Sequence, residues 1–266
     1  MKLKYFSRGL FLVSILAATV AANSQEQNAA PTPTPTSVAE TTEKGLQALK
    51  ATQPQQALDF FEQALQANPN DPAANLLAAT AALNLYKGDL AVKYAEKARD
   101  LDPDNWKVHT TLVAAYAAAG KKEQRDQERD ILRKLHDDPH APEAMQTKGF
   151  LLEMFPVKSY RVEAIEYFQP VDKFHIFYRF LIRNAAGKRV WQIDVESNDF
   201  DQSSWAKAHP DEAAAGKRQF QLVGADHDLH VDYRMFSGTA DYDTIREQVV
   251  ETIQQQTAPF PGETAQ

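Results

Sequence analysis

The chain has 266 residues, of which 43% are hydrophobic and 24% charged, and it contains 14 prolines and no cysteine. Its 29 basic and 36 acidic residues give a formal net charge of −7, which argues against nucleic-acid binding, because that function needs clustered Lys and Arg. The lack of cysteine excludes disulfides, zinc–thiolate sites, iron–sulfur clusters and thiol nucleophiles. Length and composition favour a folded protein of about two domains.

Residues 1–22 have the three-part pattern of a secretory signal peptide. Lys2, Lys4 and Arg8 form a positive start, an apolar run covers 10–18, and small residues follow. The run is shorter than the roughly 20 residues of a spanning helix, so we expect cleavage and a periplasmic or extracellular protein. The alternative is an uncleaved signal anchor. A bacterial lipid anchor needs a cysteine at the cleavage site, so none is expected.

Residues 23–40 form a linker rich in proline and threonine, with Pro31, Pro33 and Pro35 alternating with Thr. Proline fixes φ and removes a backbone donor, so this stretch favours extended polyproline II structure. We interpret it as a semi-stiff spacer, with a Pro-rich ligand for a partner as the alternative.

The middle of the chain, 41–145, contains an internal repeat. Residues 57–71 and 91–105 align with a constant offset of 34 positions, with small residues in register and a proline near the end of each. Small side chains allow two helices to approach closely, and a proline ends the second helix of a pair. The aligned pairs are Ala57 with Ala91, Phe61 with Ala95, Ala64 with Ala98, and Pro69 with Pro103.

This period and pattern resemble the tetratricopeptide (TPR) repeat over roughly residues 38–140. The resemblance implies about three helix pairs, with Gly45 at the family's helix-A glycine and the third pair beginning at Trp106. The second helix of that pair is highly charged, which is typical of a terminal cap that faces water or the next domain. An unrelated alanine-rich helical bundle is the alternative.

TPR domains commonly hold a peptide against the first helix of each pair, so the resemblance implies a protein or peptide partner. Only Lys50 and Asn84 would contribute to the carboxylate clamp that some TPR domains use, so we expect a small apolar groove instead. The alternative is that the linker or the C-terminal domain fills this groove. The predicted partner-binding residues, which we call the A-helix face, are Leu46, Lys50, Leu76, Thr80, Leu83, Asn84 and Thr110.

Residues 146–256 predict an α+β domain that resembles no family we can name. Aromatic residues become frequent and alternate with polar ones, which indicates about five to six antiparallel strands. A C-terminal helix over 241–254 follows, and 257–266 is predicted to be a disordered tail. The fold class is therefore multidomain, with TPR helices before a sheet and one helix. The predicted strands are 149–157, 160–169, 173–182, 189–195, 218–224 and 229–236.

No motif predicts a catalytic, metal or cofactor site. A His and Asp cluster near 226–232 is better explained as a charged turn than as a metal site, and the acids of 194–201 as a solvated strand end. Ser203 and Ser204 lie in no nucleophile elbow. The clustered residues are Asp226, His227, Asp228, His230 and Asp232, and then Asp194, Glu196, Asp199 and Asp201.

The sequence therefore predicts an exported, non-enzymatic TPR protein that acts as an interaction scaffold or adaptor in the cell envelope. A small-ligand-binding or enzymatic function seated in the C-terminal domain is the alternative, because a curved sheet under one helix can enclose a pocket.

Overall fold

The computed structural model describes residues 35–141, 149–171, 176–197, 207–214, 217–225, 231–239 and 241–260. The predicted signal peptide and most of the predicted linker lie outside these ranges. Residues from Pro33 onward form one compact unit, which contains both the helical repeats and the sheet. Within this unit the helical repeats come first and the sheet follows.

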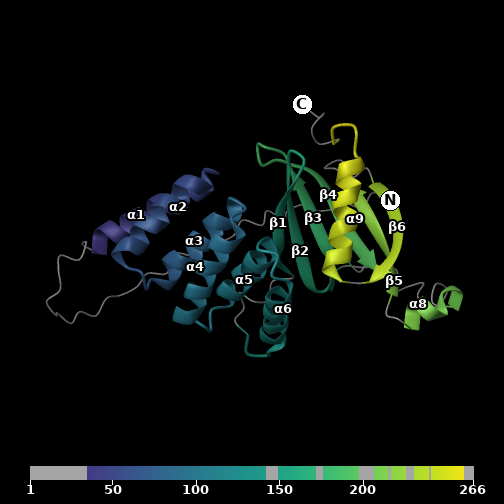
Figure 1. Ribbon diagram of the computed structural model, residues 1–266, viewed down its shortest axis with the longest axis horizontal. Helices are drawn as coiled ribbons and strands as arrows, with labels where there is room; N and C mark the ends of the chain where they lie inside the picture. Colours follow the sequence, from purple (N-terminus) through teal and green to yellow (C-terminus); the bar gives the residue numbers. More distant parts are fainter. Residues whose placement is uncertain are drawn as a thin grey trace, which may run out of the picture. The chain divides into compact units, whose positions relative to one another are not determined.

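Six helices form three pairs in the first half of this unit (Figure 1). The second helices α2, α4 and α6 begin 34 residues apart, and so do the first helices α3 and α5. This spacing confirms the TPR architecture. The helices are α1 Pro35–Lys50, α2 Pro54–Ala67, α3 Pro72–Asn84, α4 Gly88–Leu101, α5 Trp106–Ala118 and α6 Lys122–Asp137.

Helix α1 begins at Pro35, so the predicted linker boundary at residue 40 is wrong. Proline is tolerated in the first turn of a helix, where its missing N–H has no intrahelical partner in any case. The repeating Pro-Thr pattern therefore ends inside the repeat region.

Capping residues and glycines explain why the pairs recur. Asp71 and Asn105, which are 34 residues apart, cap α3 and α5 by accepting hydrogen bonds from backbone amides two or three residues later. A Cβ at Gly45 would lie 2.5 Å from the Phe61 ring, so the helix-A glycine of the TPR pattern allows this close packing. A Cβ at Gly88 would lie 2.5 Å from the backbone of Ala118, so α4 and α5 approach through this glycine.

The turn inside each helix pair contains one residue in the left-handed region. Thr52, Tyr86 and Gly120 are 34 residues apart and have φ values of 59°, 56° and 70°. Left-handed backbone costs a non-glycine residue roughly 1–2 kcal/mol. The third pair therefore has the residue best suited to this turn.

This difference predicts opposite effects at equivalent positions. Thr52→Gly should raise the free energy of unfolding by up to about 1 kcal/mol, and Gly120→Ala should lower it by about 1 kcal/mol. A Cβ at Gly120 would meet nothing within 4 Å, so backbone strain alone should account for its effect. Urea unfolding of both variants measures this, and equal signs for the two changes would contradict it.

The second half of the unit is a six-stranded antiparallel sheet in which each strand pairs with its neighbours in the sequence. Helix α9, Tyr242–Gln255, packs on one face, and the short helix α8, Pro210–Ala214, lies between β4 and β5 (Figure 1). The predicted α+β class is confirmed. The strands are β1 Gly149–Val157, β2 Tyr160–Val171, β3 Ile176–Arg183, β4 Arg189–Ser197, β5 Lys217–Ala225 and β6 Val231–Thr239.

Three local features define the ends of these elements. Pro156 lies inside β1 opposite Arg161, and the turn to β2 follows at Lys158 with a φ of 54°. Pro210 is the first residue of the short helix α8. Asp241 caps α9 by accepting a hydrogen bond from the Thr244 amide at 2.9 Å.

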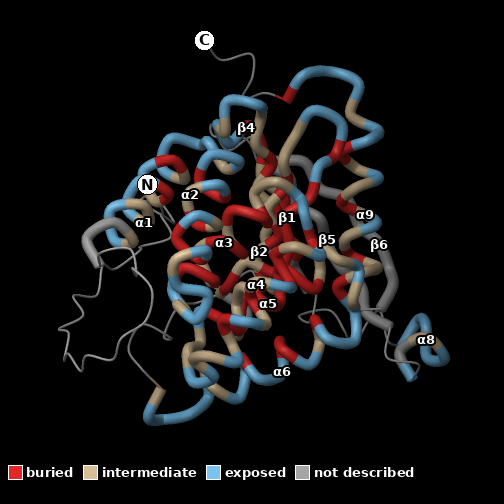
Figure 2. Tube along the Cα trace, turned by 60° about the vertical axis from the view of Figure 1, so that its left-hand side comes forward, coloured by how far each residue is buried: buried red, intermediate tan, exposed pale blue. Residues whose placement is uncertain are grey.

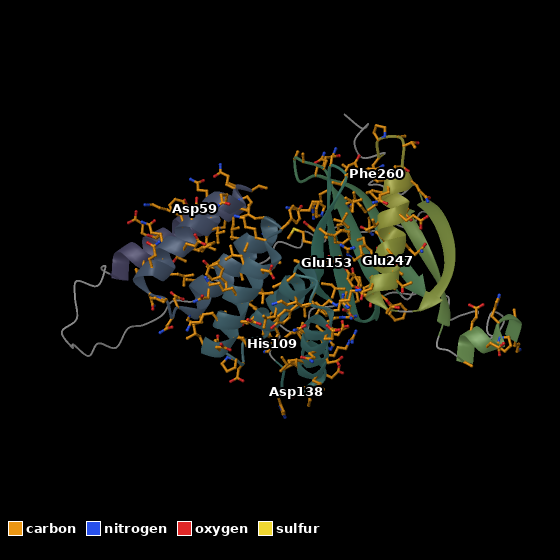
Figure 3. The ribbon with its side chains drawn as sticks, in the orientation of Figure 1. Asp59, His109, Asp138, Glu153, Glu247 and Phe260 are labelled. Atoms are coloured by element: carbon orange, nitrogen blue, oxygen red, sulfur yellow. The ribbon has the colours of Figure 1, made fainter. Side chains whose placement is uncertain are left out.

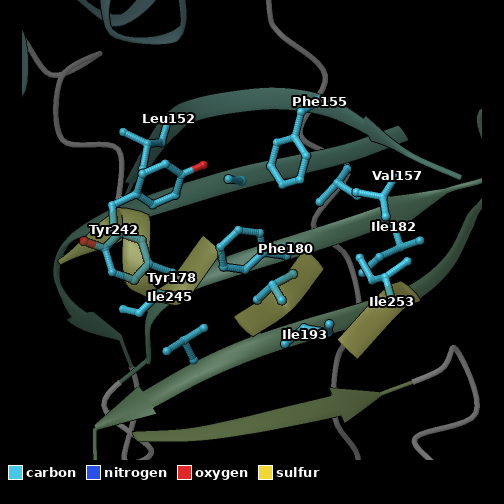
Figure 4. Packing of buried hydrophobic residues seen from close by; sticks show 14 of the residues in the cluster. Leu152, Phe155, Val157, Tyr178, Phe180, Ile182, Ile193, Tyr242, Ile245 and Ile253 are labelled. Carbon is cyan, nitrogen blue, oxygen red and sulfur yellow. The ribbon is translucent and has the colours of Figure 1, made fainter. Parts of the chain in front are cut away.

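The alternating apolar residues of β3 and β4 form the core between the sheet and α9. Phe180, Ile182 and Ile193 are at most 1% exposed, as are Ile245 and Ile253 of α9. Figure 4 shows these side chains pointing toward one another from the strands and the helix. The burial pattern in Figure 2 runs without a break from the repeats into the sheet, since Val113 of α5 and Leu132 of α6 belong to the same core.

The predicted disordered tail is wrong at its start. Phe260 is 1% exposed, and its ring centroid lies 4.8 Å from that of Trp191 and 4.9 Å from that of Tyr160. Burial of this one aromatic side chain holds 257–260 against the sheet, while 261–266 lie outside the described residues.

Candidate functional site

The polar members of the A-helix face bond mainly to their own helices. Thr80 donates its hydroxyl to the Leu76 carbonyl at 3.0 Å, Asn84 donates to the Thr80 carbonyl at 2.9 Å, and Thr110 donates to the Lys107 carbonyl at 2.8 Å. Lys50, at the end of α1, is exposed. The face therefore offers a partner few free donors besides Lys50.

The leucines of the A-helix face are divided between two clusters. Leu46 is half-buried against the cluster formed by α1, α2 and the start of α3. Leu76 and the buried Leu83 belong to the next cluster, which also contains Leu151 and Met154 of β1. Part of the predicted face therefore lies in one apolar cluster with residues of the protein's own sheet.

Strand β1 lies along α5 and covers the first helix of the third pair (Figure 1). Ala114 of α5 is 1% exposed and shares its cluster with Met154 of β1, which is 7% exposed. The prediction that the C-terminal domain fills part of the groove is therefore confirmed at the third repeat. Most of the A-helix face that stays partly exposed lies on α1 and α3, with Thr110 of α5 also partly exposed. The partner-binding role of these residues stays a prediction.

The charged helix α6 faces the sheet. From the repeat pattern, it could have faced either water or the next domain. Arg129 is 9% exposed and donates to both carboxylate oxygens of Glu166 on β2, at 2.7 Å and 2.9 Å, and to the Tyr178 hydroxyl at 3.1 Å. Arg133 also bonds Glu166. Arg125 donates to both oxygens of Asp243 on α9 at 2.8 Å and 3.2 Å.

Ion pairing and burial shift the pKa values of two of these partners. Hydrogen bonding to Arg125 lowers the pKa of Asp243, and burial raises the pKa of Tyr178 to about 12. The sequence signal was present as arginines at i, i+4 and i+8 on one helix, which places them on one face. Their acidic partners are far away in the sequence, so the ion pairs were not predictable.

A second buried polar group joins α9 to β1. Glu153, which is 5% exposed, accepts hydrogen bonds from the Tyr242 hydroxyl at 2.5 Å and from Arg246 at 2.7 Å. Figure 3 places Glu153 on the sheet beside α9. Complete burial raises the pKa of Tyr242 well above its usual value, so it remains a neutral donor. This group is saturated by its own partners and holds the fold together.

His109 of α5, labelled in Figure 3, is buried. Its Nδ1 lies 2.7 Å from a carboxylate oxygen of Glu128 on α6, and its Nε2 lies 3.1 Å from the Pro103 carbonyl. An imidazole that faces an acceptor at each nitrogen satisfies both only when it is doubly protonated. The hydrogen bond to Glu128 raises the pKa of His109, opposed by burial and by Arg99.

This geometry predicts a pH dependence. A raised folded-state pKa gives stabilisation that is complete below the unfolded-state pKa near 6.5 and is lost as pH rises through the folded-state pKa. His109→Gln should cost about 1–3 kcal/mol near pH 6, and the gap to the parent protein should shrink toward about pH 9. Urea unfolding across this range measures it, and a gap that grows with pH would contradict it.

Most of the residues that the sequence analysis considered for a metal or catalytic site lie outside the described residues. The turn 226–230 is not described, and neither are Asp199, Asp201, Ser203 and Ser204. Asp194 is paired with Arg179 at 2.7 Å and 2.9 Å, which supports a structural role for that acid. Over the described ranges, no three His, Asp or Glu residues gather in a way that would hold a metal ion.

No helix among the described residues combines the length and the apolar character needed to cross a membrane.

Comparison with solved structures finds TPR domains and a TPR protein. No family model and no curated protein matches the sequence. Among solved structures, the TPR domain of Arabidopsis OM64 is 22% identical, covers 41% of this chain and 88% of its own, and has a TM-score of 0.36.

The first TPR of Spaghetti (RPAP3), solved with an HSP90 peptide, is 20% identical over 44% of this chain and 94% of its own, with a TM-score of 0.38. The TPR protein TTC0263 of Thermus thermophilus is 26% identical over 36% of this chain and 50% of its own, with a TM-score of 0.31. The TPR assignment of residues 35–137 therefore rests on the 34-residue helix spacing in this structure.

Proposed function

We propose that this protein is an exported scaffold that binds a peptide or protein segment on the A-helix face of its first two repeats. The observation that supports this most is the partly exposed surface of α1 and α3, with Leu46, Lys50 and Thr80, beside a third repeat whose equivalent surface is already covered by β1. Strand β1 packs on the equivalent surface of α5, so an extended segment can bind to a first helix of these repeats.

The proposal makes export a part of the function. Its support is the signal-peptide pattern of residues 1–22. N-terminal sequencing of the protein recovered from expressing cells should give Asn23 or Gln25 as the first residue. An intact Met1 would contradict the processed, exported form.

The alternative of a ligand pocket between the sheet and α9 receives no support from the described residues, because Phe180, Ile193 and Val249 fill that space at 1% exposure or less. No specific observation favours an enzymatic function.

A variant pair with equal charge changes tests the interaction site. Lys50→Glu with Thr80→Glu changes the A-helix face, and Lys44→Glu with Gln63→Glu makes the same charge change at exposed positions elsewhere. Pull-down from an envelope extract with quantitative mass spectrometry should show partners enriched by the parent and the control pair and lost by the first pair. Equal recovery by both pairs would contradict the proposal, and circular dichroism checks that both fold.

A further inference from the structure

A groove lined mainly by α4 has no role in the function proposed above. It is open, has a volume of about 620 Å³, and runs along α4 between the end of α2 and Lys121, which precedes α6. We call it the α4 groove. Its lining residues are Leu65, Pro69, Asn75, Asp89, Val92, Lys93, Tyr94, Glu96, Lys97, Asp100 and Lys121.

The floor of the α4 groove is apolar and fixed. Leu65 is 8% exposed and Val92 is 3% exposed, so both are held by the repeat core. Tyr94 is half-buried, and its hydroxyl donates to Glu62 of α2 at 2.8 Å. A ring held at both ends in this way presents a rigid contact surface at low entropic cost.

Most acids around the α4 groove already have partners. Glu96 accepts the Tyr116 hydroxyl at 2.8 Å, Glu62 accepts the Tyr94 hydroxyl, and Asp100 lies 3.6 Å from Arg99. Asp89 lies in the first turn of α4, where the free amides of the helix start stabilise a negative charge.

The lysines of the α4 groove differ from these acids because they have no partner of opposite charge in the described residues. Within the described part of the chain, none of Lys93, Lys97 and Lys121 has a carboxylate oxygen within the 4.0 Å of an ion pair. Lys93 and Lys97 stand four residues apart on α4, and like charges at this spacing destabilise a helix by about 0.2–0.5 kcal/mol. The Lys93 Nζ atom lies 5.5 Å from the centroid of the Tyr94 ring, a contact that leaves its N–H donors available to a carboxylate. In the described residues, therefore, all three ammonium groups can still pair with an acidic partner.

We propose that the α4 groove binds an acidic peptide segment of a partner protein, with carboxylates pairing with Lys93, Lys97 and Lys121 and an apolar residue resting on Leu65, Val92 and Tyr94. The cations follow the length of a helix, and Lys93 and Lys97 are about 6 Å apart along its axis. That spread fits acids distributed along a chain better than one compact anion. This site is separate from the A-helix face.

The test is selection of a random dodecapeptide phage library on the purified protein, with affinities of the selected peptides measured by fluorescence anisotropy. The selected peptides should be enriched in Asp and Glu. They should bind at least tenfold more weakly to the double variant Lys93→Glu with Lys97→Glu, and more weakly in high salt. Both lysines are exposed, so this variant should fold as the parent does.

Controls separate this site from the A-helix face. The pair Lys44→Glu with Lys188→Glu makes the same charge change at exposed positions elsewhere and should leave affinity unchanged. Recovery of no peptide, no enrichment in acids, or equal binding to the Lys93 and Lys97 variant would overturn the proposal. Loss of binding only in the Lys50 and Thr80 variant would overturn it too, while supporting the A-helix face.

Discussion

Replacing Arg129 by methionine should lower the free energy of unfolding by about 3 kcal/mol, near the low end of the range for breaking a buried ion pair. The change leaves Glu166, whose side chain is 3% exposed, without two charge-assisted hydrogen bonds. Arg133 still bonds Glu166, which is why the loss should not reach the upper end of that range. Urea unfolding followed by circular dichroism measures the effect.

Two further variants make the Arg129 prediction specific. Lys134→Met changes an exposed residue on the same helix and should stay within about 0.5 kcal/mol of the parent. The double change of Arg129 and Glu166 to methionine removes both charges and should recover part of the lost stability. A loss under about 1 kcal/mol for Arg129→Met alone would mean that this ion pair does not hold α6 against the sheet.

Phe260→Ala should cost about 3–5 kcal/mol, as is usual when a buried aromatic side chain is removed from a core. The reason is its contact with the rings of Trp191 and Tyr160. Gln254→Ala, at an exposed position of α9, is the matched control and should have little effect. Thermal or urea unfolding measures both, and equal stabilities of the two variants would show that residue 260 belongs to a disordered tail after all.

Much of the architecture was predictable because it depends on short-range patterns. Small residues and prolines at a spacing of 34 define helix pairs that each contact mainly their neighbours, so their positions follow from the sequence alone. Apolar alternation likewise predicted the strands, because Tyr178, Phe180 and Ile182 lie on the one face of β3 that is buried.

The features that sequence reasoning missed depend on contacts between distant residues. Arg129 and Glu166 are 37 residues apart, and Arg125 and Asp243 are 118 apart, so neither pair leaves a local pattern. Phe260 follows a stretch with little else to bury, which made the tail resemble a disordered end. The sequence offered filling of the groove by the C-terminal domain only as an alternative, because the strand that covers α5 is set by how the distant sheet docks.

The α4 groove could not be predicted from the sequence either, although the sequence contains all of its lysines. A mixed run of charges on a helix reads as a solvated surface. Only the structure shows that Glu96 and Asp100 have partners while Lys93 and Lys97 have none within ion-pair distance in the described residues.

The repeats and the sheet are expected to unfold as one cooperative unit, because α6 and the packing of β1 on α5 join them. The direct measurement uses a variant with Trp106 and Trp205 changed to Phe, which leaves Trp191 of the sheet as the single fluorescent probe. Helix content by circular dichroism and Trp191 fluorescence should give coincident urea transitions. Two transitions separated by more than about 0.5 M urea would show that repeats and sheet unfold independently and would contradict the claim.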